Sequence, residues 1–295
     1  MKNIHFCKRT KQFFEGWYLK HDNNSEVIAF IPGINIENKT AKAFIQIITN
    51  DGTYQADFDF DDFKASKKEF DVIIGPNRFN NFGIKVDIDI KGFRCFGEIF
   101  YGTFIRPKFN IMGPLCVFKN LECNHGILSL FHSLNGRLNV NGKVINFTNG
   151  SGYIEKDWGV QFPEKYTWLH FVESNTNNML IAAVATVPFM GIKVKGHIVV
   201  VLENGRQYRF ATYNFSKIKK YNDAQIFFKK GRYKLEIYIL DNEKGYALKA
   251  PVSGAMKRTI FERLQAKVKV RFYKGRKLIF ERDSNRASLE IISGN

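Results

Sequence analysis

The chain has 295 residues, of which 44% are hydrophobic and 15% aromatic. This composition excludes a disordered protein, supplies material for an apolar core, and at this length favours two domains. The formal net charge is +17, and residues 151–295 hold most of it, with 26 basic and 13 acidic side chains against 19 and 15 in residues 1–150. A basic surface attracts nucleic acid or anionic lipid headgroups, or is simply solvated without a partner.

Cysteine spacing and hydropathy limit the cellular context. No C-x-x-C pair occurs among Cys7, Cys95, Cys116 and Cys123, so no zinc knuckle or dithiol redox motif is indicated. The first ten residues carry charges where a signal peptide needs an apolar stretch. The longest apolar run, Met179 to Ile192, is interrupted by Pro188 and is shorter than the roughly 20 residues of a membrane-spanning helix. We therefore expect a cytoplasmic protein.

Short stretches of alternating apolar and polar residues predict the secondary structure. Residues 43–48, 84–90 and 233–239 alternate with a period of two, which is the pattern of β-strands. Dipeptides such as Asn135-Gly136 and Asn141-Gly142 separate such stretches and favour tight hairpin turns. The pattern predicts an all-β, mainly antiparallel fold.

One helix is predicted from about Gly254 to Gln265, because Met256, Ile260 and Leu264 recur at helical spacing. No Pro-rich or Ser-rich linker divides the chain, so charge and motifs place the domain boundary near Asn141. The predicted domains are residues 1–140 and 141–295. A closed or nearly closed barrel of about eight strands can hold one small ligand, so each half could enclose a pocket.

Several common enzyme motifs are absent from the sequence. It contains no Gly-rich phosphate loop, G-x-S-x-G or H-E-x-x-H, and no cofactor is expected. The first polar cluster within an apolar stretch lies at residues 14–20. On a strand, Glu15 and Trp17 share one face while Tyr18 lies on the other. Glu15 is therefore a candidate buried acid, and the alternative is a solvated or ion-paired strand residue.

A second cluster, residues 122–133, combines Glu, Cys, His and Ser in the manner of a metal or nucleophile site. On a strand, His125 and Ser129 point one way and His132 the other, so the two imidazoles would not share an ion. We expect no metal. His125 is a candidate hydrogen-bonding group of a pocket, and the alternative is a structural core histidine.

The third cluster, residues 150–163, is the most informative. On a strand Tyr153, Glu155 and Asp157 share a face, and two like charges held close together there would keep one carboxyl protonated as a general acid. If that face is solvated, the row is only a surface charge pair. Lys156 would face the other side with Trp158, where it can pair with another carboxylate.

Eight short motifs, in this order, resemble those of the tocopherol cyclase-like proteins. They are Phe14-Glu-Gly-Trp-Tyr, Ile31-Pro-Gly, Met112-Gly-Pro-Leu, Glu122-Cys-Asn-His-Gly-Ile-Leu-Ser, Gly152-Tyr-Ile-Glu-Lys-Asp-Trp-Gly, Phe162-Pro, Phe210-Ala-Thr-Tyr and Ala250-Pro-Val-Ser-Gly-Ala-Met. Any one is weak evidence, but together they cover nearly the whole chain. The E-x-W-Y and D-W-G elements also look distantly like those of lipocalin-like carotenoid hydratases.

The resemblance implies two lipocalin-like β-barrel halves with one or two short helices. It also implies a reaction in which an acid protonates an isoprenoid double bond and an oxygen nucleophile captures the cation. Because the Lys-, Asn- and Ile-heavy composition looks unlike that of a photosynthetic source, tocopherol itself need not be the substrate. Family membership supports the fold more than the reaction.

We therefore expect an intramolecular cyclase or hydratase-like enzyme for a prenylated, hydrophobic substrate. Asp157 or Glu155 would donate the proton, and Glu15 and His125 would orient it. The residues expected to bind substrate are Trp17, Tyr153, Trp158, Gln161 and Trp168. The basic second half could contact an anionic membrane at its periphery.

Two rival functions remain open. A non-catalytic carrier of an apolar ligand needs the same pocket but not the carboxyl row. A nucleic-acid-binding protein would use the lysines and arginine between Lys217 and Arg232. Nucleic acid is the least favoured partner, because strand cores also explain the aromatic residues between these basic ones.

Overall fold

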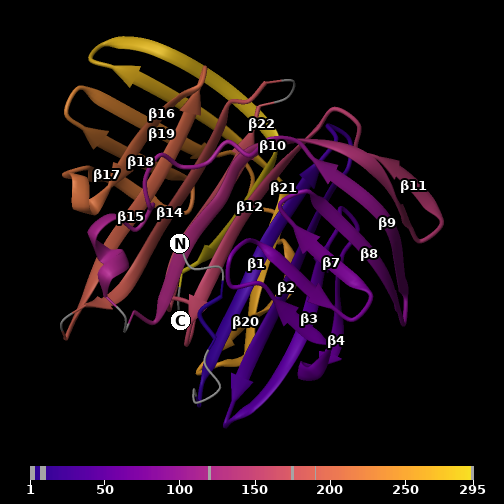
Figure 1. Ribbon diagram of the computed structural model, residues 1–295. Helices are drawn as coiled ribbons and strands as arrows, with labels where there is room; N and C mark the ends of the chain where they lie inside the picture. The colour runs from indigo at the N-terminus through magenta and orange to yellow at the C-terminus, as the bar shows by residue number, and fades with distance from the viewer. Residues whose placement is uncertain (1–3, 7–10, 119–120, 174–175, 190, 294–295) are drawn as a thin grey trace. The chain divides into compact units, whose positions relative to one another are not determined.

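The computed structural model describes residues 4–6, 11–118, 121–173, 176–189 and 191–293. Its strands form two antiparallel sheets (Figure 1). The prediction of an all-β, mainly antiparallel protein with two lipocalin-like β-barrel halves is confirmed. Within the described ranges helical turns occur only as three short 3-10 segments, η1 (Phe60–Asp62), η2 (Gly113–Val117) and η3 (Thr212–Asn214).

The chain forms two compact units. Unit 1 comprises Met1–Met112, Phe118–Phe162 and Leu248–Thr259, and unit 2 comprises Gly113–Val117, Pro163–Ala247 and Ile260–Asn295. Asn141, near which the sequence placed the domain boundary, lies in the turn from Val140 to Lys143 within unit 1, with a φ of 50°. A turn signal in the sequence does not distinguish a hairpin within a domain from a boundary between domains.

Unit 1 contains a 12-stranded sheet in which β11 pairs with β10 beside the main path β4-β3-β2-β1-β12-β10-β9-β8-β7-β6-β5. Its strands are β1 (Phe13–Asp22), β2 (Val27–Glu37), β3 (Thr40–Ile48), β4 (Thr53–Asp59), β5 (Phe63–Ala65), β6 (Asp71–Ile74), β7 (Asn77–Asn80), β8 (Gly83–Ile90), β9 (Phe93–Tyr101), β10 (Cys123–Val140), β11 (Lys143–Asn146) and β12 (Gly150–Gly159). The first and last of these strands in the sequence, β1 and β12, pair directly with each other in the sheet.

The core of unit 1 lies on one face of these strands. Trp17, Leu19 and Ile154 belong to it, and all are at most 1% exposed. Because successive strand residues point to opposite faces, the residues between them, among them Tyr18 and Glu155, point away from this core. The sheet thereby presents a second, polar face along β1 and β12.

Unit 2 contains a 10-stranded sheet in which β20 pairs with β21 beside the main path β16-β15-β14-β13-β22-β21-β19-β18-β17. Its strands are β13 (Lys165–Val172), β14 (Met179–Phe189), β15 (Ile192–Glu203), β16 (Arg206–Ala211), β17 (Lys217–Asn222), β18 (Gln225–Lys230), β19 (Tyr233–Ile239), β20 (Tyr246–Val252), β21 (Ala255–Lys274) and β22 (Lys277–Ile292). β20 and β21 each contribute residues to both units. The apolar core of unit 2 includes Leu169, Phe228 and Phe272.

The predicted helix from about Gly254 to Gln265 is wrong, because these residues begin the long strand β21. Residues that are four positions apart share a face in a strand as well as in a helix, so the spacing of Ile260 and Leu264 fits both. Ile260, Glu262 and Leu264 are all buried on one face of the strand. Because Glu262 is polar, the apolar residues alone did not show the two-residue alternation.

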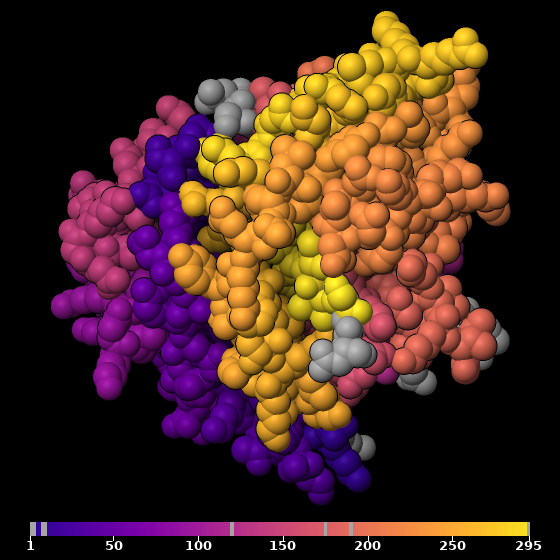
Figure 2. All heavy atoms as spheres, turned by 180° about the vertical axis from the view of Figure 1, so that it is seen from behind, coloured from indigo at the N-terminus to yellow at the C-terminus, as the bar shows by residue number. Residues whose placement is uncertain are grey.

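None of the helical segments in the described ranges is long and apolar enough to cross a membrane. Figure 2 shows all heavy atoms from the opposite side, with the late strands of the chain, β21 and β22, in light orange to yellow.

Candidate active site

The central strand β12 carries charged residues on both faces, and its neighbours β1 and β10 complete each set. Glu155 lies opposite Tyr18 on β1 and opposite Ile127 on β10, and Asp157 lies opposite His125. Side chains of directly opposed residues point to the same face. One face therefore gathers His125, Tyr153, Glu155 and Asp157, which we call the histidine–carboxylate cluster.

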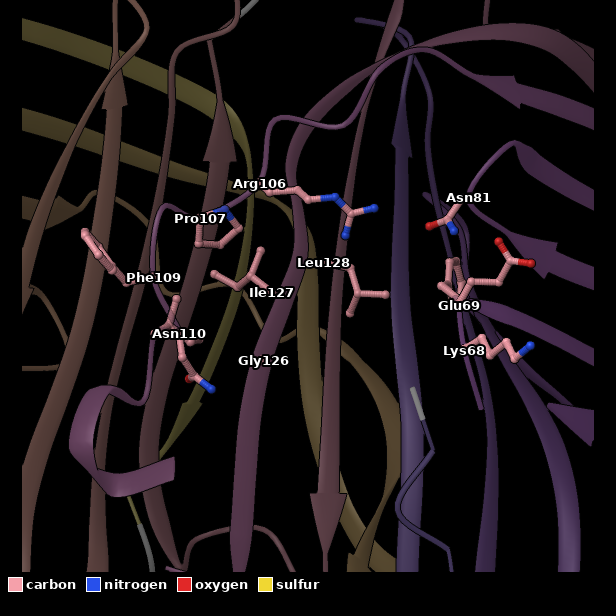
Figure 3. Close-up of a pocket in the computed structure, with 12 residues that line it drawn as sticks. Lys68, Glu69, Asn81, Arg106, Pro107, Phe109, Asn110, Gly126, Ile127 and Leu128 are labelled. Atoms are coloured by element: carbon pink, nitrogen blue, oxygen red, sulfur yellow. The ribbon is translucent and has the colours of Figure 1, made fainter. Parts of the chain in front are cut away.

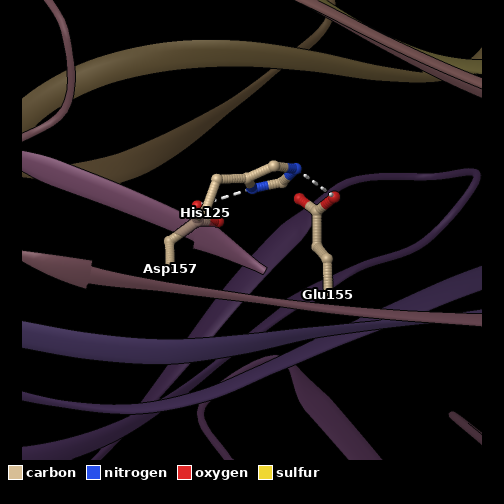
Figure 4. Close-up of side chains that lie close together, drawn as sticks. All are labelled: His125, Glu155 and Asp157. Carbon is tan, nitrogen blue, oxygen red and sulfur yellow. Dashed lines mark hydrogen bonds and ion pairs between the residues drawn. The ribbon is translucent and has the colours of Figure 1, made fainter. Parts of the chain in front are cut away.

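In this cluster the His125 ring lies between two carboxylates (Figure 4). Its Nδ1 is 2.8 Å from Asp157 Oδ1, and its Nε2 is 3.6 Å from Glu155 Oε2. Tyr153 donates its hydroxyl proton to Glu155 Oε2 over 2.5 Å. Glu155 is 5% exposed and the side chain of Asp157 is 19% exposed, so the two carboxylates are not a solvated surface pair.

The charge on His125 follows from this arrangement. Burial disfavours the charged ring, but the negative charges of Asp157 and Glu155 outweigh burial and raise the pKa of His125 to about 9. The imidazolium then balances one of the two negative charges at neutral pH. From the sequence we expected the repulsion between the Glu155 and Asp157 carboxylates to be reduced by protonation of one of them. In the structure the His125 cation between them reduces the same repulsion.

The same three residues also have the donor types of a metal site. One nitrogen of His125 and one oxygen each of Glu155 and Asp157 lie within 4.8 Å of one another. A metal ion would require a neutral imidazole and ligand distances near 2.0–2.2 Å. The 2.8 Å contact between His125 Nδ1 and Asp157 Oδ1 is also the geometry of a hydrogen bond that holds a proton.

The opposite face of β12 holds a second charged group, which we call the lysine–glutamate pair. Lys156 Nζ is 2.5 Å from Glu15 Oε1, and the two side chains are 1% and 0% exposed. Lys156 also lies 4.8 Å from the ring centre of Trp17 and 5.3 Å from that of Trp158. The sequence-based prediction that Lys156 pairs with a carboxylate on this side is confirmed by these contacts.

Glu15 is held ionised by its neighbours. Burial alone would raise its pKa, but the hydrogen bonds from His5 and the charge of Lys156 lower it below its usual value. The backbone N–H groups of His5 and Phe6 donate to the carboxylate at 2.9 and 3.1 Å, and the His5 ring stacks on Trp158 at 4.0 Å. The structure thus places Glu15 and both tryptophans on the face away from the histidine–carboxylate cluster, and it does not bring Glu15 to the proposed proton donors.

His132 lies in a separate buried network of unit 1. Its Nδ1 is 2.9 Å from Ser129 Oγ, and its ring packs 4.3 Å from that of Tyr101, whose hydroxyl is 2.7 Å from His21 Nε2. The predicted grouping of Ser129 with His125 is wrong. β10 shifts register between Ile127 and Ser129 and again before His132, so strict alternation fails there.

The remaining predicted binding residues lie elsewhere. Gln161 follows β12 and donates to Glu122 Oε1 at 3.1 Å. Trp168 belongs to β13 of unit 2, where it is 7% exposed and stacks on His170 at 6.3 Å. Tyr18 was not predicted as a site residue, although its alternation with Trp17 was a signal that it faces away from the core.

Comparison with known proteins gives the family. The model of the tocopherol cyclase-like family matches residues 99–293. The chain belongs to this family. The match includes the strands that carry His125, Glu155 and Asp157. No curated protein matches the chain.

Solved structures with a similar fold differ widely in sequence. An AttH-like protein of Nitrosomonas europaea has 10% identity and a TM-score of 0.58, over 96% of this chain and 93% of that one. Kievitone hydratase of Nectria haematococca has 10% identity and a TM-score of 0.54, over 98% and 93%. CghA, solved with Sch210972, has 9% identity and a TM-score of 0.60, over 96% and 89%. At such identities these structures show the fold alone.

Proposed function

We propose that this tocopherol cyclase-like protein catalyses an acid-initiated intramolecular cyclisation of a prenylated hydroquinone or a similar isoprenoid. The observation that carries the proposal is the position of His125, whose two ring nitrogens face Asp157 and Glu155 at 2.8 and 3.6 Å. A buried imidazole between two carboxyl groups can hold a proton and deliver it to a substrate, which is what general acid catalysis requires.

The proton path follows from the contacts in the cluster. Charged His125 passes a proton to Glu155 or Asp157, and the neutral carboxyl that results is the donor. Its O–H bond breaks as a C–H bond forms on the substrate alkene, which leaves a tertiary cation. The substrate's own hydroxyl oxygen then forms a C–O bond to that carbon, and the hydroxyl proton returns to the carboxylate. Product and substrate have the same composition, so the reaction is an isomerisation.

Aromatic side chains on the cluster's face can stabilise the cation. Tyr153 contacts Glu155 directly, and Tyr18 lies opposite Glu155 in the β1–β12 register. The negative face of an aromatic ring attracts a cation by about 0.5–2 kcal/mol. On this proposal Tyr153 keeps the substrate-binding role expected from the sequence, and Tyr18 replaces Trp17 and Trp158, which lie on the other face.

The names of the family and of one structural neighbour support this class of reaction. The family is described as tocopherol cyclase-like, and one structural neighbour is named a hydratase. Cyclisation by an internal hydroxyl and hydration by water share the same first step, which is protonation of a double bond, and differ in the source of the oxygen nucleophile.

Identification of the natural ligand is the first test. The protein is purified from its own host, extracted with organic solvent and analysed by mass spectrometry. A bound isoprenoid quinol or phenol supports the proposal. A protein that carries only ordinary fatty acids supports instead the alternative of a non-catalytic carrier of apolar ligands.

Turnover by variants is the second test. With a prenylated hydroquinone as substrate, the double variant Asp157→Asn/Glu155→Gln is expected to lose activity by roughly 10²- to 10⁴-fold. Asp87→Asn, at an exposed carboxylate of β8 in the same unit, is the matched control and keeps full activity. Undiminished turnover by the double variant would overturn the assignment of the proton donor.

A further inference from the structure

Unit 1 contains a cavity of about 320 Å³ beside β10 (Figure 3). Its lining includes Lys68, Glu69, Asn81, Arg106, Gly126 and Ile127. Phe70, Ile111 and Leu128 are buried and give it an apolar wall. A volume of this size is at the lower end of the range of small-molecule sites.

The cavity lies beside the part of β10 that precedes its pairing with β9. Farther along the strand, Leu134 to Val140 pair with β9, and Phe131 makes an isolated bridge to Ile105. The chain then leaves this edge at Arg106, and the segment from Arg106 to Ile111 forms one wall of the cavity opposite Lys68 to Phe70. The backbone of Gly126 can be approached closely there, because glycine has no side chain.

Arg106 gives the cavity an oriented positive group. Its guanidinium lies 5.3 Å from the ring centre of Phe104, and Figure 3 shows it extending toward the wall that carries Asn81 and Glu69. Stacking uses the flat face of a guanidinium, whereas its N–H donors lie in the plane and match the two oxygens of a carboxylate or phosphate. Lys68 adds a second positive charge to the lining.

The lining holds two cationic residues, Arg106 and Lys68, and one acidic residue, Glu69. The positive charges outnumber the negative one, and an apolar wall with cationic residues fits an amphiphile that has an oxyanion at one end.

The cavity is also close to the histidine–carboxylate cluster. Ile127 lines the cavity and is the direct cross-strand partner of Glu155. Directly opposed residues of antiparallel strands have Cα atoms about 4.5–5.5 Å apart. A chain that lies along Ile127 would thus place its far carbons within one strand spacing of the proposed proton donors.

We propose that this cavity binds an isoprenoid chain that ends in an oxyanion, with Arg106 holding the carboxylate or phosphate and Ile111 and Leu128 contacting the chain. This inference rests on the proposed function, because it assigns the substrate class of the same site. Of the isoprenoids that the proposed function allows, the inference selects those with a charged end, which a prenylated hydroquinone lacks.

Calorimetric binding of three probes with one chain length tests the inference: farnesoic acid, farnesyl phosphate and farnesol. The parent protein is expected to bind at least one anionic probe about tenfold more tightly than farnesol, and the better of the two identifies the carboxylate or the phosphate. Arg106→Gln is expected to abolish this preference and to change the affinity for farnesol less than twofold. Arg94→Gln is the matched control, because Arg94 is exposed and stacks similarly on Phe96 at 5.5 Å.

Equal binding of acid, phosphate and alcohol by the parent would overturn the inference, as would an equal effect of Arg106→Gln and Arg94→Gln. The same titrations with His125→Gln separate the two proposals, since binding requires no turnover. Retained anion preference in that variant supports the cavity assignment whatever the result of the turnover assay. Loss of turnover in the cluster variants, without anion preference in the parent, would leave the proposed function standing and remove this inference.

Discussion

Glu155 and Lys156 are consecutive residues of β12, and their side chains lie in two separate charged groups on opposite faces of one sheet. Glu155 faces His125 and Tyr153, whereas Lys156 forms an ion pair with Glu15 beside Trp17. The alternation of a strand thus separates the histidine–carboxylate cluster from a buried ion pair in which the lowered pKa of Glu15 keeps its carboxylate ionised. The two groups make different predictions for stability and pH dependence.

The lysine–glutamate pair is expected to be structural. Lys156→Met leaves Glu15, which is 0% exposed, without its cationic partner, and breaking such a buried pair costs about 3–5 kcal/mol of unfolding free energy. Urea denaturation measures this loss. Lys143→Met is the control, because Lys143 pairs with Glu26 on the surface, and it should cost less than about 1 kcal/mol. Similar losses in both variants would contradict a structural role specific to the buried pair.

His125 should make stability depend on alkaline pH. Its folded pKa of about 9 lies above the unfolded value of 6.5, so its contribution is fully present below pH 6.5 and is lost as the pH rises through 9. The difference corresponds to about 3 kcal/mol. Unfolding free energies measured from pH 6 to 10 should fall more steeply in the parent than in His125→Gln. Parallel curves would show that the ring is not charged in the folded protein.

His21 should act in the opposite direction. Burial lowers its pKa to about 3, so the folded protein keeps the ring neutral while the unfolded chain takes up a proton below pH 6.5. Stability from this group is therefore present above pH 6.5 and is lost as the pH falls toward 3, by several kcal/mol. His21→Gln should reduce the slope of unfolding free energy between pH 6.5 and 4. An unchanged slope would place the acid sensitivity in other groups.

Gly152 is expected to tolerate no side chain. A Cβ at this position would lie 2.2 Å from Nε2 of the buried His132, so Gly152→Ala must displace a packed ring. We expect a loss of about 1–3 kcal/mol. Gly16→Ala is the control, because a Cβ there meets its nearest neighbour, the Pro32 carbonyl oxygen, at 3.7 Å. Thermal or urea unfolding of the two variants decides the point, and equal stabilities would contradict the packing argument.

Local patterns were enough to predict much of the fold and part of the candidate site. Alternation placed Glu15 and Trp17 on one face of β1, and Tyr153, Glu155 and Asp157 on one face of β12, as the register shows. The same reasoning failed where one local pattern is compatible with two structures. The spacing of Ile260 and Leu264 suits a helix or a strand, and the bulges of β10 reverse the faces after Ile127.

The sequence by itself determined which side chains share a face, because the two-residue period of a strand is a property of the local backbone. Only the tertiary structure decided which faces meet. The pairing of β12 with β10 puts His125 opposite Asp157, and its pairing with β1 puts Lys156 opposite Trp17. These contacts join residues that are 32 and 139 positions apart, and their register depends on packing and hydrogen bonding across the whole sheet, which no local pattern encodes.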